Sequence, residues 1–188
     1  KKISRIKYLQ LIKFLKLMKI LQKSQIQEAD RQTILMEPIA SEELMERSAK
    51  ACFKWICQHY DTDQKFSLLC GTGNNGGDGL ALYRMLCEKN YSCTLFEYSL
   101  ENKPTDDYVR NKLKIGNKKI NALSLESLSI IQKNDIIIDA LLGTGLNRPV
   151  KGTLKKIIQA LNAMPNIVLS IDIPSGLFSD FNTGNTLD

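Results

Sequence analysis

A nine-residue turn rich in glycine, GTGNNGGDG at 71–79, constrains the fold of this chain more than any other segment. A short apolar run, FSLLC (66–70), precedes the turn, and a helical pattern, LALYRMLCEKN (80–90), follows it. Glycines between a buried strand and a helix allow a tight turn and a close approach of the backbone to a phosphate, which the free N–H groups of the helix start then face. The first six residues of the turn match G-x-G-x-x-G. The sequence therefore predicts a nucleotide-binding α/β unit around this turn.

The alternation of apolar strand and amphipathic helix continues beyond the turn. SCTLFEY (92–98), DIIIDALLG (135–143) and NIVLSIDIPSG (166–176) are predicted strands, and VKGTLKKIIQALNAM (150–164) is a predicted helix. Residues 100–118 are polar without a clear period, so a loop and part of a helix are expected there. This alternation predicts an α/β, Rossmann-like three-layer sandwich with a mainly parallel sheet. Because a doubly wound sheet normally has more strands, we expect the fold to be truncated at its C-terminus.

Two helices are predicted before the first strand. Ser24 and Gln27 fit a capping box at the start of the first helix, which should end before Pro38. The second helix should start near Ser41, because the acids that follow suit the positive end of a helix dipole. Its apolar stripe is expected from Leu44, Cys52, Trp55 and Ile56.

The formal net charge of +6 belongs to the beginning of the chain and not to the predicted domain. Residues 1–23 hold eight of the 26 Lys and Arg residues and no acid, which leaves 18 basic and 20 acidic residues, a balance of −2, in the remainder. The folded part is therefore nearly neutral, and nucleic acid is not an expected partner.

The basic segment itself has three interpretations. Its apolar residues recur between lysines, as in a membrane-surface helix. A transit peptide fits less well, because serine is scarce. We favour a third interpretation, in which the segment lies outside the native protein, since Met18 begins a plausible translation start, MKIL. We therefore predict that residues 1–17 are a basic leader outside the fold and that 18–188 form one domain.

The cysteines and the single histidine argue against disulfides and against a site for a soft metal. The five Cys residues are odd in number and include no C-x-x-C pair, and the chain is 43% hydrophobic, enough to build a core without disulfides. His59 is the only histidine, so clusters of imidazole and thiolate ligands are not expected. No apolar run is long enough to span a bilayer. We expect reduced thiols in a cytoplasmic protein without a membrane partner.

Acidic residues end three of the predicted strands. Glu97 occupies the position at which a Rossmann dehydrogenase places the acid that binds the ribose of NAD. Asp139 and Asp172 end the next two strands, and each precedes a loop that contains glycine. A single Asp of this kind is more often a turn former. Ligands of open α/β sheets bind beyond the carboxyl ends of the strands, where both acids would meet the 71–79 turn, so the pair favours a functional site.

The polar residues of the turn are unusual for a dehydrogenase. Asn74, Asn75 and Asp78 place three polar side chains in it. An acid at Asp78 would repel a pyrophosphate bound at the same helix end unless a cation or a hydroxyl lies between them. Asn and Asp oxygens are ligands that suit hard cations.

Three motifs together resemble the YjeF N-terminal domain family, the NAD(P)H-hydrate epimerases. They are GTGNNGGDGL (71–80), DALLGTGLNRPVKG (139–152) and SIDIPSGL (170–177). The segment 24–49 is similar to the opening helices of the family, although Ser48-Ala49 replaces the Ala-Gly with which this motif commonly ends. The resemblance extends from residue 18 to about 188, with the motifs in the family's order and spacing.

The resemblance implies a role for each matching residue. Asp172 would face the hydrated nicotinamide as the catalytic residue, and K+ would be the cofactor, with Asn75, Asp139 and Ser175 as its ligands. The loop from Gly143 to Pro149 would surround the phosphates and the ribose. The implied substrate-binding residues are Asn74, Asn75, Gly76, Gly77, Asp78, Gly143, Thr144, Gly145, Leu146, Asn147, Arg148, Pro149 and Asp172.

The implied reaction is the interconversion of the R and S forms of hydrated NADH and NADPH (NADHX and NADPHX) at nicotinamide C6, an isomerase reaction that repairs a cofactor. The C6 hydroxyl lies beside the ring nitrogen, whose lone pair can expel hydroxide. An acid must protonate the leaving hydroxyl and a base must activate the returning water. We expect the carboxyl group of Asp172 to serve both steps.

Two other functions are open at the level of sequence. An NAD-dependent dehydrogenase would use Glu97 for the ribose and would not need the asparagines of the turn. A non-catalytic YjeF-type binding or scaffold module would be expected to lose its acids, whereas Asp78, Asp139 and Asp172 are all present. The partners considered are the dinucleotide substrate, a second copy of the chain in a homodimer, and a fused C-terminal ADP- or ATP-dependent dehydratase domain.

Overall fold

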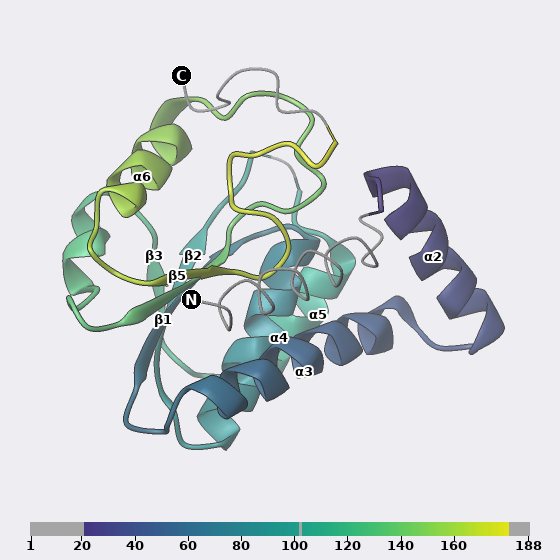
Figure 1. Cartoon of the computed structure of the whole chain (residues 1–188), viewed down its shortest axis with the longest axis horizontal. Coiled ribbons are helices and arrows are strands. Elements are labelled where there is room, and N and C mark those ends of the chain that lie inside the picture. Colours follow the sequence, from purple (N-terminus) through teal and green to yellow (C-terminus); the bar gives the residue numbers. More distant parts are fainter. Residues whose placement is uncertain (1–20, 102, 181–188) are drawn as a thin grey trace, which may run out of the picture.

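The computed structural model describes residues 21–101 and 103–180 of the chain (Figure 1). The predicted leader, 1–17, lies outside the described residues. Within them, a parallel sheet has helices on both faces, which confirms the predicted Rossmann-like three-layer α/β fold.

The sheet of the described part has five parallel strands in the order β3-β2-β1-β4-β5. Their bounds are Lys65–Gly71 (β1), Ser92–Tyr98 (β2), Ile120–Ala122 (β3), Ile136–Ala140 (β4) and Val168–Ser170 (β5). The four strands predicted from the sequence are β1, β2, β4 and β5, and they are adjacent in one sheet. β1 is central and buried beyond its first residue, because layers of helix cover both of its faces.

The helices form two groups on opposite faces of the sheet (Figure 1). α3 (Ser41–His59), α4 (Asn74–Glu88) and α5 (Asp106–Ile115) lie on one face, and α6 (Gly152–Asn162) with the 3-10 helix η1 (Glu126–Ile130) lies on the other. None of the helices in 21–101 and 103–180 combines the length and the apolarity needed to cross a membrane.

Alternate residues of the central strands divide between two hydrophobic clusters. In β1, Leu68 and Cys70 belong to the cluster beneath α3 and α4, whereas Leu69 belongs to the cluster beneath α6. In β4, Ile138 and Ile137 divide in the same way. Because both faces are buried, a shift of one residue in either strand would exchange the two sets, so the clusters hold the register that aligns the strand ends.

α4 begins at Asn74, inside the segment predicted as a turn. Gly73 is its N-cap, and the N–H of Gly77 donates to the Gly73 carbonyl (3.0 Å), so the first helical turn lies within the glycine-rich segment. The predicted helix start at residue 80 was wrong. Low helix propensity of glycine indicated a loop, but tight packing of this segment against its neighbours overrides propensity.

The first helix, α2 (Lys23–Met36), begins before the predicted Ser24 cap. Gln22 is the N-cap residue, and its N–H donates to the Gln25 side chain (2.9 Å), so a glutamine pair replaces the predicted capping box. The predicted end before Pro38 is confirmed.

α3 starts where predicted, and of its predicted stripe Ile56 is buried and Cys52 packs against the core, whereas Trp55 does not. Met45, Ala49 and Ile56 are its buried residues, whereas Trp55 is 45% exposed and stacks on the His59 ring. The pattern of apolar residues allowed two neighbouring faces that share Ile56. Packing against α4 selects the face that carries the small Ala49.

β4 (Ile136–Ala140) is shorter than the predicted 135–143, and two other strands differ more from the predictions. β3 was not predicted, because a strand of three residues gives no readable alternation. β5 contains only Val168–Ser170 of the predicted 166–176, although the N–H of Ile171 still donates to the Asp139 carbonyl (3.1 Å). The residues after β5 therefore leave the sheet and turn toward the end of β4.

Candidate active site

A cavity of about 1220 Å³ lies beyond the carboxyl ends of β1 and β4. The strand order reverses at this point, because β2 lies on one side of β1 and β4 on the other. Open α/β sheets bind their ligands at such switch points. The walls come from the start of α4, the segment 141–154 after β4, Asp172 after β5, and one face of α2. The three segments predicted to converge do converge, and their cavity is large enough for a dinucleotide.

The start of α4 presents its first polar residues to this cavity. Asn74 is exposed and Asn75 is buried, and both line the cavity with Gly73 and Asp78. The first N–H groups of a helix have no partner within the helix and carry the positive end of its dipole. This end of α4 therefore suits an anionic or oxygen-rich ligand.

The glycines of the turn differ in what they permit. A Cβ on Gly71 would lie 2.1 Å from the Leu141 carbonyl oxygen, and one on Gly76 would lie 1.7 Å from the Gly71 carbonyl oxygen. The nearest atom to a Cβ on Gly73 would be 3.9 Å away. Gly71 and Gly76 therefore serve contact of backbone with backbone, and not the approach to phosphate expected for the pattern as a whole. Gly73 is the one of the three that borders the cavity.

The three predicted ion ligands meet around the backbone of Leu142. Asn75 Nδ2 donates to the Leu142 carbonyl (2.8 Å), and Ser175 Oγ accepts from the Leu142 N–H (2.9 Å). Ser175 donates through Oγ to Asp139 Oδ1 (2.6 Å) and through its N–H to Asp139 Oδ2 (2.8 Å). All three side chains are buried. The ends of β1, β4 and β5 are thereby joined through one polar cluster.

One oxygen of this cluster has no partner among the described residues. Asn75 Oδ1 is buried and accepts no hydrogen bond. An unpaired buried oxygen costs about 1–3 kcal/mol, so it marks a place for a cation or a water molecule. Amide, hydroxyl and carboxylate oxygens suit a hard cation. In residues 21–101 and 103–180, no group of three or more His, Cys, Asp or Glu residues could hold a different metal.

Asp172 lies two residues past β5 and lines the cavity. Its Oδ2 accepts from the N–H of Thr144 (2.7 Å), and the residue as a whole is exposed. A Cβ on Gly143 would lie 2.5 Å from the same Oδ2 and 3.1 Å from the Cβ of Asn75. Gly143 is therefore the point at which the α4 turn, the loop after β4 and Asp172 touch.

The predicted substrate loop, 143–149, lines the cavity along its whole length. The N–H of Leu146 donates to the Gly143 carbonyl (3.1 Å), and the Leu146 side chain packs on the cluster beneath α6, which anchors the loop. Arg148 lies 3.2 Å from Glu101, with both side chains largely exposed. An exposed ion pair of this kind contributes little to stability, so the Arg148 guanidinium is free to exchange its partner for a phosphate.

Among the acids that line the cavity, Asp78 has the pKa that its surroundings raise most. Burial raises its pKa to about 7, and the nearby charges of Asp172, Asp30 and Asp107 add to the effect. Near neutral pH a large share of this carboxyl group is protonated. The protonated carboxyl group has no charge, so it does not repel a pyrophosphate as the sequence led us to expect.

Asp30 of α2 was not predicted as a site residue. It lines the same cavity, and partial burial together with the charge of Asp172 raises its pKa. On the sequence it is one acid in a polar helix, and no spacing distinguishes it from a solvent-facing residue. α2 buries no side chain, and the Lys23 N–H donates to the Asp180 carboxylate (2.9 Å) at its start. Only the tertiary structure identifies α2 as a wall of the site.

Glu97 does not have the position that a dehydrogenase requires. Its Oε2 accepts from the Tyr108 hydroxyl and from Lys112 Nζ (2.6 Å for Lys112). The residue does not line the cavity, although its neighbour Tyr98 does. Both of its partners lie on α5, so this acid fastens α5 to the end of β2.

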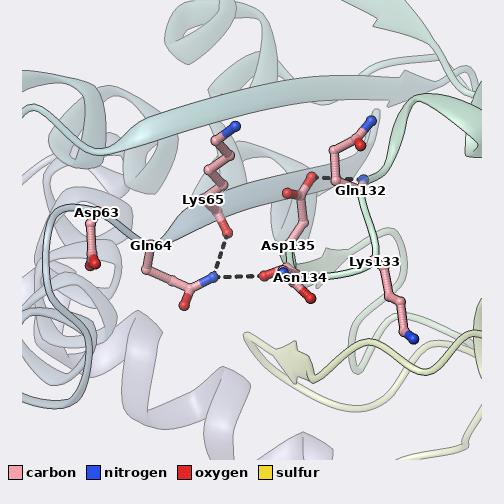
Figure 2. Close-up of a pocket in the computed structure, with 7 residues that line it drawn as sticks. All are labelled: Asp63, Gln64, Lys65, Gln132, Lys133, Asn134 and Asp135. Atoms are coloured by element: carbon pink, nitrogen blue, oxygen red, sulfur yellow. Dashed lines mark hydrogen bonds between the residues drawn. The ribbon is translucent and has the colours of Figure 1, made fainter.

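A second cavity, of about 460 Å³, lies at the opposite edge of the sheet, where β1 and β4 begin (Figure 2). Asp135 Oδ2 accepts from Ser67 Oγ (2.9 Å) and from the Gln132 N–H (3.2 Å). Gln64 Nε2 donates to the Asn134 carbonyl (2.8 Å), as the dashed line in Figure 2 shows. These bonds tie the two strand starts together, and no predicted site residue lies here.

Comparison with known proteins identifies relatives along most of the chain. The family model of the YjeF-related protein N-terminus matches residues 41–188. An NAD(P)H-hydrate epimerase of Anaerococcus prevotii is 34% identical over 154 residues, which cover 77% of this chain and 70% of that protein. A bifunctional NAD(P)H-hydrate repair enzyme Nnr of Dictyoglomus turgidum is 34% identical over 141 residues, which cover 73% of this chain and 27% of that protein. The chain spans less than a third of the length of the bifunctional relatives.

A solved structure shares the fold. The crystal structure of the yeast protein YNL200c matches with a TM-score of 0.70 and covers 85% of this chain and 72% of that chain, at 22% sequence identity. At this level of identity the likeness shows the fold alone.

Proposed function

Because this chain belongs to the family of the YjeF-related protein N-terminus, we propose that it is an NAD(P)H-hydrate epimerase. It interconverts the R and S forms of NADHX and NADPHX at C6 of the hydrated nicotinamide. Relatives named for this activity occur both as separate epimerases and as bifunctional repair enzymes.

The convergence of three distant segments on Gly143 is the observation that carries the proposal. The start of α4, the loop after β4 and the turn after β5 meet there, with Asn75 and Asp172 both next to the glycine. A cavity of about 1220 Å³ opens at this junction. To bind and epimerise a dinucleotide, a site needs a helix start that binds anions, a loop for the phosphates and a titratable group at the nicotinamide. This junction brings all three together.

The substrate is held by the parts of the cavity that carry N–H groups and cations. The first turn of α4 faces the phosphates, and Arg148 gives up its exposed contact with Glu101 to pair with one of them. Asp78, with its pKa near 7, donates a hydrogen bond to a substrate oxygen when it is protonated. These contacts leave the nicotinamide beside Asp172.

Asp172 acts as the acid and the base. The hydrogen bond from the Thr144 N–H to Oδ2 (2.7 Å) holds the carboxyl group at the cavity wall. A carboxyl group at this position protonates the departing C6 hydroxyl, and the resulting carboxylate removes a proton from the water that returns to the other face of the ring. The nitrogen lone pair supplies the electrons for departure, so one titratable group is sufficient.

K+ is the proposed cofactor, held by Asn75, Asp139 and Ser175. The unpartnered Oδ1 of Asn75 and the all-oxygen donor set fit a hard monovalent cation. Such an ion supplies a fixed positive charge that draws the ends of β1, β4 and β5 together. The protein residues orient the substrate and move the proton.

The surroundings of Glu97 do not favour a dehydrogenase. Binding of a ribose to Glu97 would require the loss of its bonds to Tyr108 and Lys112. The bifunctional relatives support a fused dehydratase domain as a partner. The five free thiols fit a reducing, cytoplasmic location. The homodimer stays a prediction.

A direct assay of epimerisation tests the proposed function. Purified R or S epimers of NADHX and NADPHX are incubated with the protein, and the approach to equilibrium is followed by separation of the two epimers. The expected result is an interconversion faster than the spontaneous rate for at least one of the two substrates. An unchanged rate with both substrates, in K+ buffer, would contradict the proposal.

A cation series tests the proposed K+ site separately. Asn75→Ala removes the amide oxygen that has no partner, so activity should fall and a high concentration of K+ should restore part of it. Na+ at the same ionic strength is the control, because the smaller ion fits the same oxygens differently. Equal recovery in both salts would show that the loss comes from altered packing around Leu142.

A further inference from the structure

α2 forms part of the wall of the active site without being part of the hydrophobic core. It has 14 residues, Lys23–Met36, and none of its side chains is buried. In Figure 1 it stands outside the two layers of helices that cover the sheet. A helix of about this length is only marginally stable in water and is usually held by a buried apolar face. The core therefore gives α2 little support, and contacts across the cavity decide its position.

The polar residues of α2 divide between two sides of the helix. Glu28 accepts hydrogen bonds from the Arg31 guanidinium (2.9 and 2.7 Å) and from Gln32 Nε2 (2.8 Å), and none of these three residues lines the cavity. Gln27 and Asp30 do line it. Within residues 21–101 and 103–180, no donor bonds to the Asp30 carboxylate and no cation pairs with it. The side of α2 that faces the cavity thus carries an acceptor that is open to a ligand.

The other acids of the cavity wall are engaged or covered. Glu101 lies 3.2 Å from Arg148, and an N–H of the loop after β4 donates to Asp172 (2.7 Å). Asp78 is half-buried at the start of α4, and its pKa of about 7 makes it a donor for a large share of the time near neutral pH. Asp30 is exposed. It is the acid of this wall that has both oxygens available.

A dinucleotide requires an acceptor for the hydroxyls of its ribose. In Rossmann proteins this acceptor is an acid at the end of the second strand. Glu97 has that position here, but its Oε2 accepts from Tyr108 and Lys112, and the residue does not line the cavity. The acid that binds a ribose must therefore come from another part of the wall.

We propose that Asp30 is a substrate-binding residue, whose carboxylate accepts hydrogen bonds from the two neighbouring hydroxyls of a ribose and thereby fastens α2 over the occupied cavity. The inference rests on the proposed function, which supplies the dinucleotide. The expected ribose is that of the nicotinamide half, because the Lys23 N–H bonds the start of α2 to Asp180 (2.9 Å), in the segment after β5 that also carries Asp172. Partial burial and the charge of Asp172 both raise the pKa of Asp30, in agreement with this placement.

Calorimetric titration of the full chain with NADH, a stable analogue of the hydrated substrate, tests the contact. Asp30→Ala should weaken NADH binding about 10–100-fold, the usual effect of losing a hydrogen bond to a charged group. Glu28→Ala is the matched control, because this acid of the same helix does not line the cavity and its loss should leave NADH affinity unchanged. Since α2 buries no side chain, both variants should fold, and circular dichroism melting verifies this.

An NADH analogue that lacks both hydroxyls of the nicotinamide ribose separates a direct contact from altered packing. The unaltered protein should bind this analogue as weakly as Asp30→Ala binds NADH. Asp30→Ala should change the affinity for the analogue by no more than about twofold, because the same interaction is lost only once. Coupling to an analogue without the adenosine ribose hydroxyls would assign the contact to the other ribose. An equal loss of affinity for NADH and both analogues would overturn the proposal.

Limited digestion with trypsin tests the fastening of α2 in the unaltered chain. Cleavage after Arg31, which is exposed, should slow roughly tenfold when NADH is present at ten times its Kd. Cleavage after Lys133, exposed at the opposite edge of the sheet, should not change. Asp30→Ala at the same occupancy should lose the protection of Arg31. Cleavage after Arg31 that NADH does not slow would overturn the proposal.

These measurements need no turnover, so they separate this contact from the proposed function. A protein that shows the coupling and the protection but does not epimerise NADHX would contradict the proposed function and retain the role of Asp30. Epimerase activity together with unaltered NADH affinity in Asp30→Ala would overturn the role of Asp30 alone.

Discussion

The regions around Asp139 and Asp172 look alike in sequence and differ in structure. Each aspartate follows an apolar run and precedes a loop with a glycine. Asp139 is 7% exposed, and its two oxygens accept four hydrogen bonds, two from Ser175, one from the Leu141 N–H and one from Ser170 Oγ. Asp172 is exposed and accepts one, from the Thr144 N–H.

The difference teaches where a strand-end acid becomes available for chemistry. β4 lies next to the central strand β1, so its end is enclosed by the neighbouring strands and by the turn at Ser175. β5 is at the edge of the sheet and ends two residues before Asp172. The inner acid therefore accepts most of its hydrogen bonds from the protein itself and holds the site together, whereas the outer acid keeps an oxygen for the ligand.

The largest expected effect separates the two acids by activity. Asp172→Asn keeps the shape and an oxygen for the Thr144 N–H but cannot exchange a proton. Epimerase turnover should fall by about 10²–10⁴-fold, the usual contribution of a positioned general acid or base. Substrate binding, measured by calorimetry, should persist. Near-full activity of Asp172→Asn would remove the distinction and transfer the catalytic role to another acid of the cavity.

A matched pair of glycine substitutions tests the geometry next to Asp172. A Cβ on Gly143 would lie 2.5 Å from the Asp172 carboxylate, whereas a Cβ on Gly145 would meet no atom within 4 Å. Gly143→Ala should reduce turnover by about 10–100-fold, because a displacement of about 1 Å in a catalytic group has that cost. Gly145→Ala, on the same loop, is the control. Equal activity of the two variants would show that the position of Asp172 does not depend on this contact.

For stability the order should be reversed, with Asp139 contributing more to the free energy of unfolding than Asp172. Asp139→Ala leaves the buried N–H of Ser175 without an acceptor and its hydroxyl with only the Leu142 carbonyl (3.3 Å), so the free energy of unfolding should fall by about 1–3 kcal/mol. Asp172→Ala removes one exposed acceptor, and a change within about 0.5 kcal/mol is expected. Urea unfolding of both variants in the same buffer measures the difference. A larger loss for Asp172→Ala would reverse the assignment of the structural role.

The smallest expected effect is on the stability of the fold, which the negative charge of the buried Asp78 lowers as pH rises. The unfolded chain releases the Asp78 proton near pH 4, the ordinary value for Asp, whereas the folded protein releases it at about pH 7. Between these values the folded state binds more protons, so this group makes stability fall as pH rises through the interval. Asp78→Asn should therefore stabilise the protein at pH 8 relative to pH 4.5, by on the order of 1 kcal/mol.

Melting temperatures of the unaltered protein and Asp78→Asn at the two pH values provide this measurement. Asp63→Asn is a suitable control, because that acid is exposed and lies just before β1, away from the cavity. A gain from Asp78→Asn that is equal at both pH values would mean that burial does not perturb Asp78.

Much of the fold could be predicted from the sequence, because the physical signals are local. β2 matches its predicted bounds, and β1 differs by one residue at each end. Runs of apolar residues between polar turns report burial on both faces without reference to other segments. Helix starts were less predictable: α4 begins within the glycine turn, and the close contact of this turn with the Leu141 backbone at Gly71 is a long-range property of the packed chain.

The site divides in the same way. The sequence by itself determined which residue types stand at the ends of the strands, and its motifs indicated Asn75, Asp139, Asp172 and Ser175 together. Only the tertiary structure decided that Asp139 is enclosed and Asp172 open, because that depends on the order of strands in the sheet. It also brought α2 and Asp30 to the cavity, by contacts that no periodicity encodes. Strand order and helix docking are set by burial summed over the whole chain, which no single segment carries.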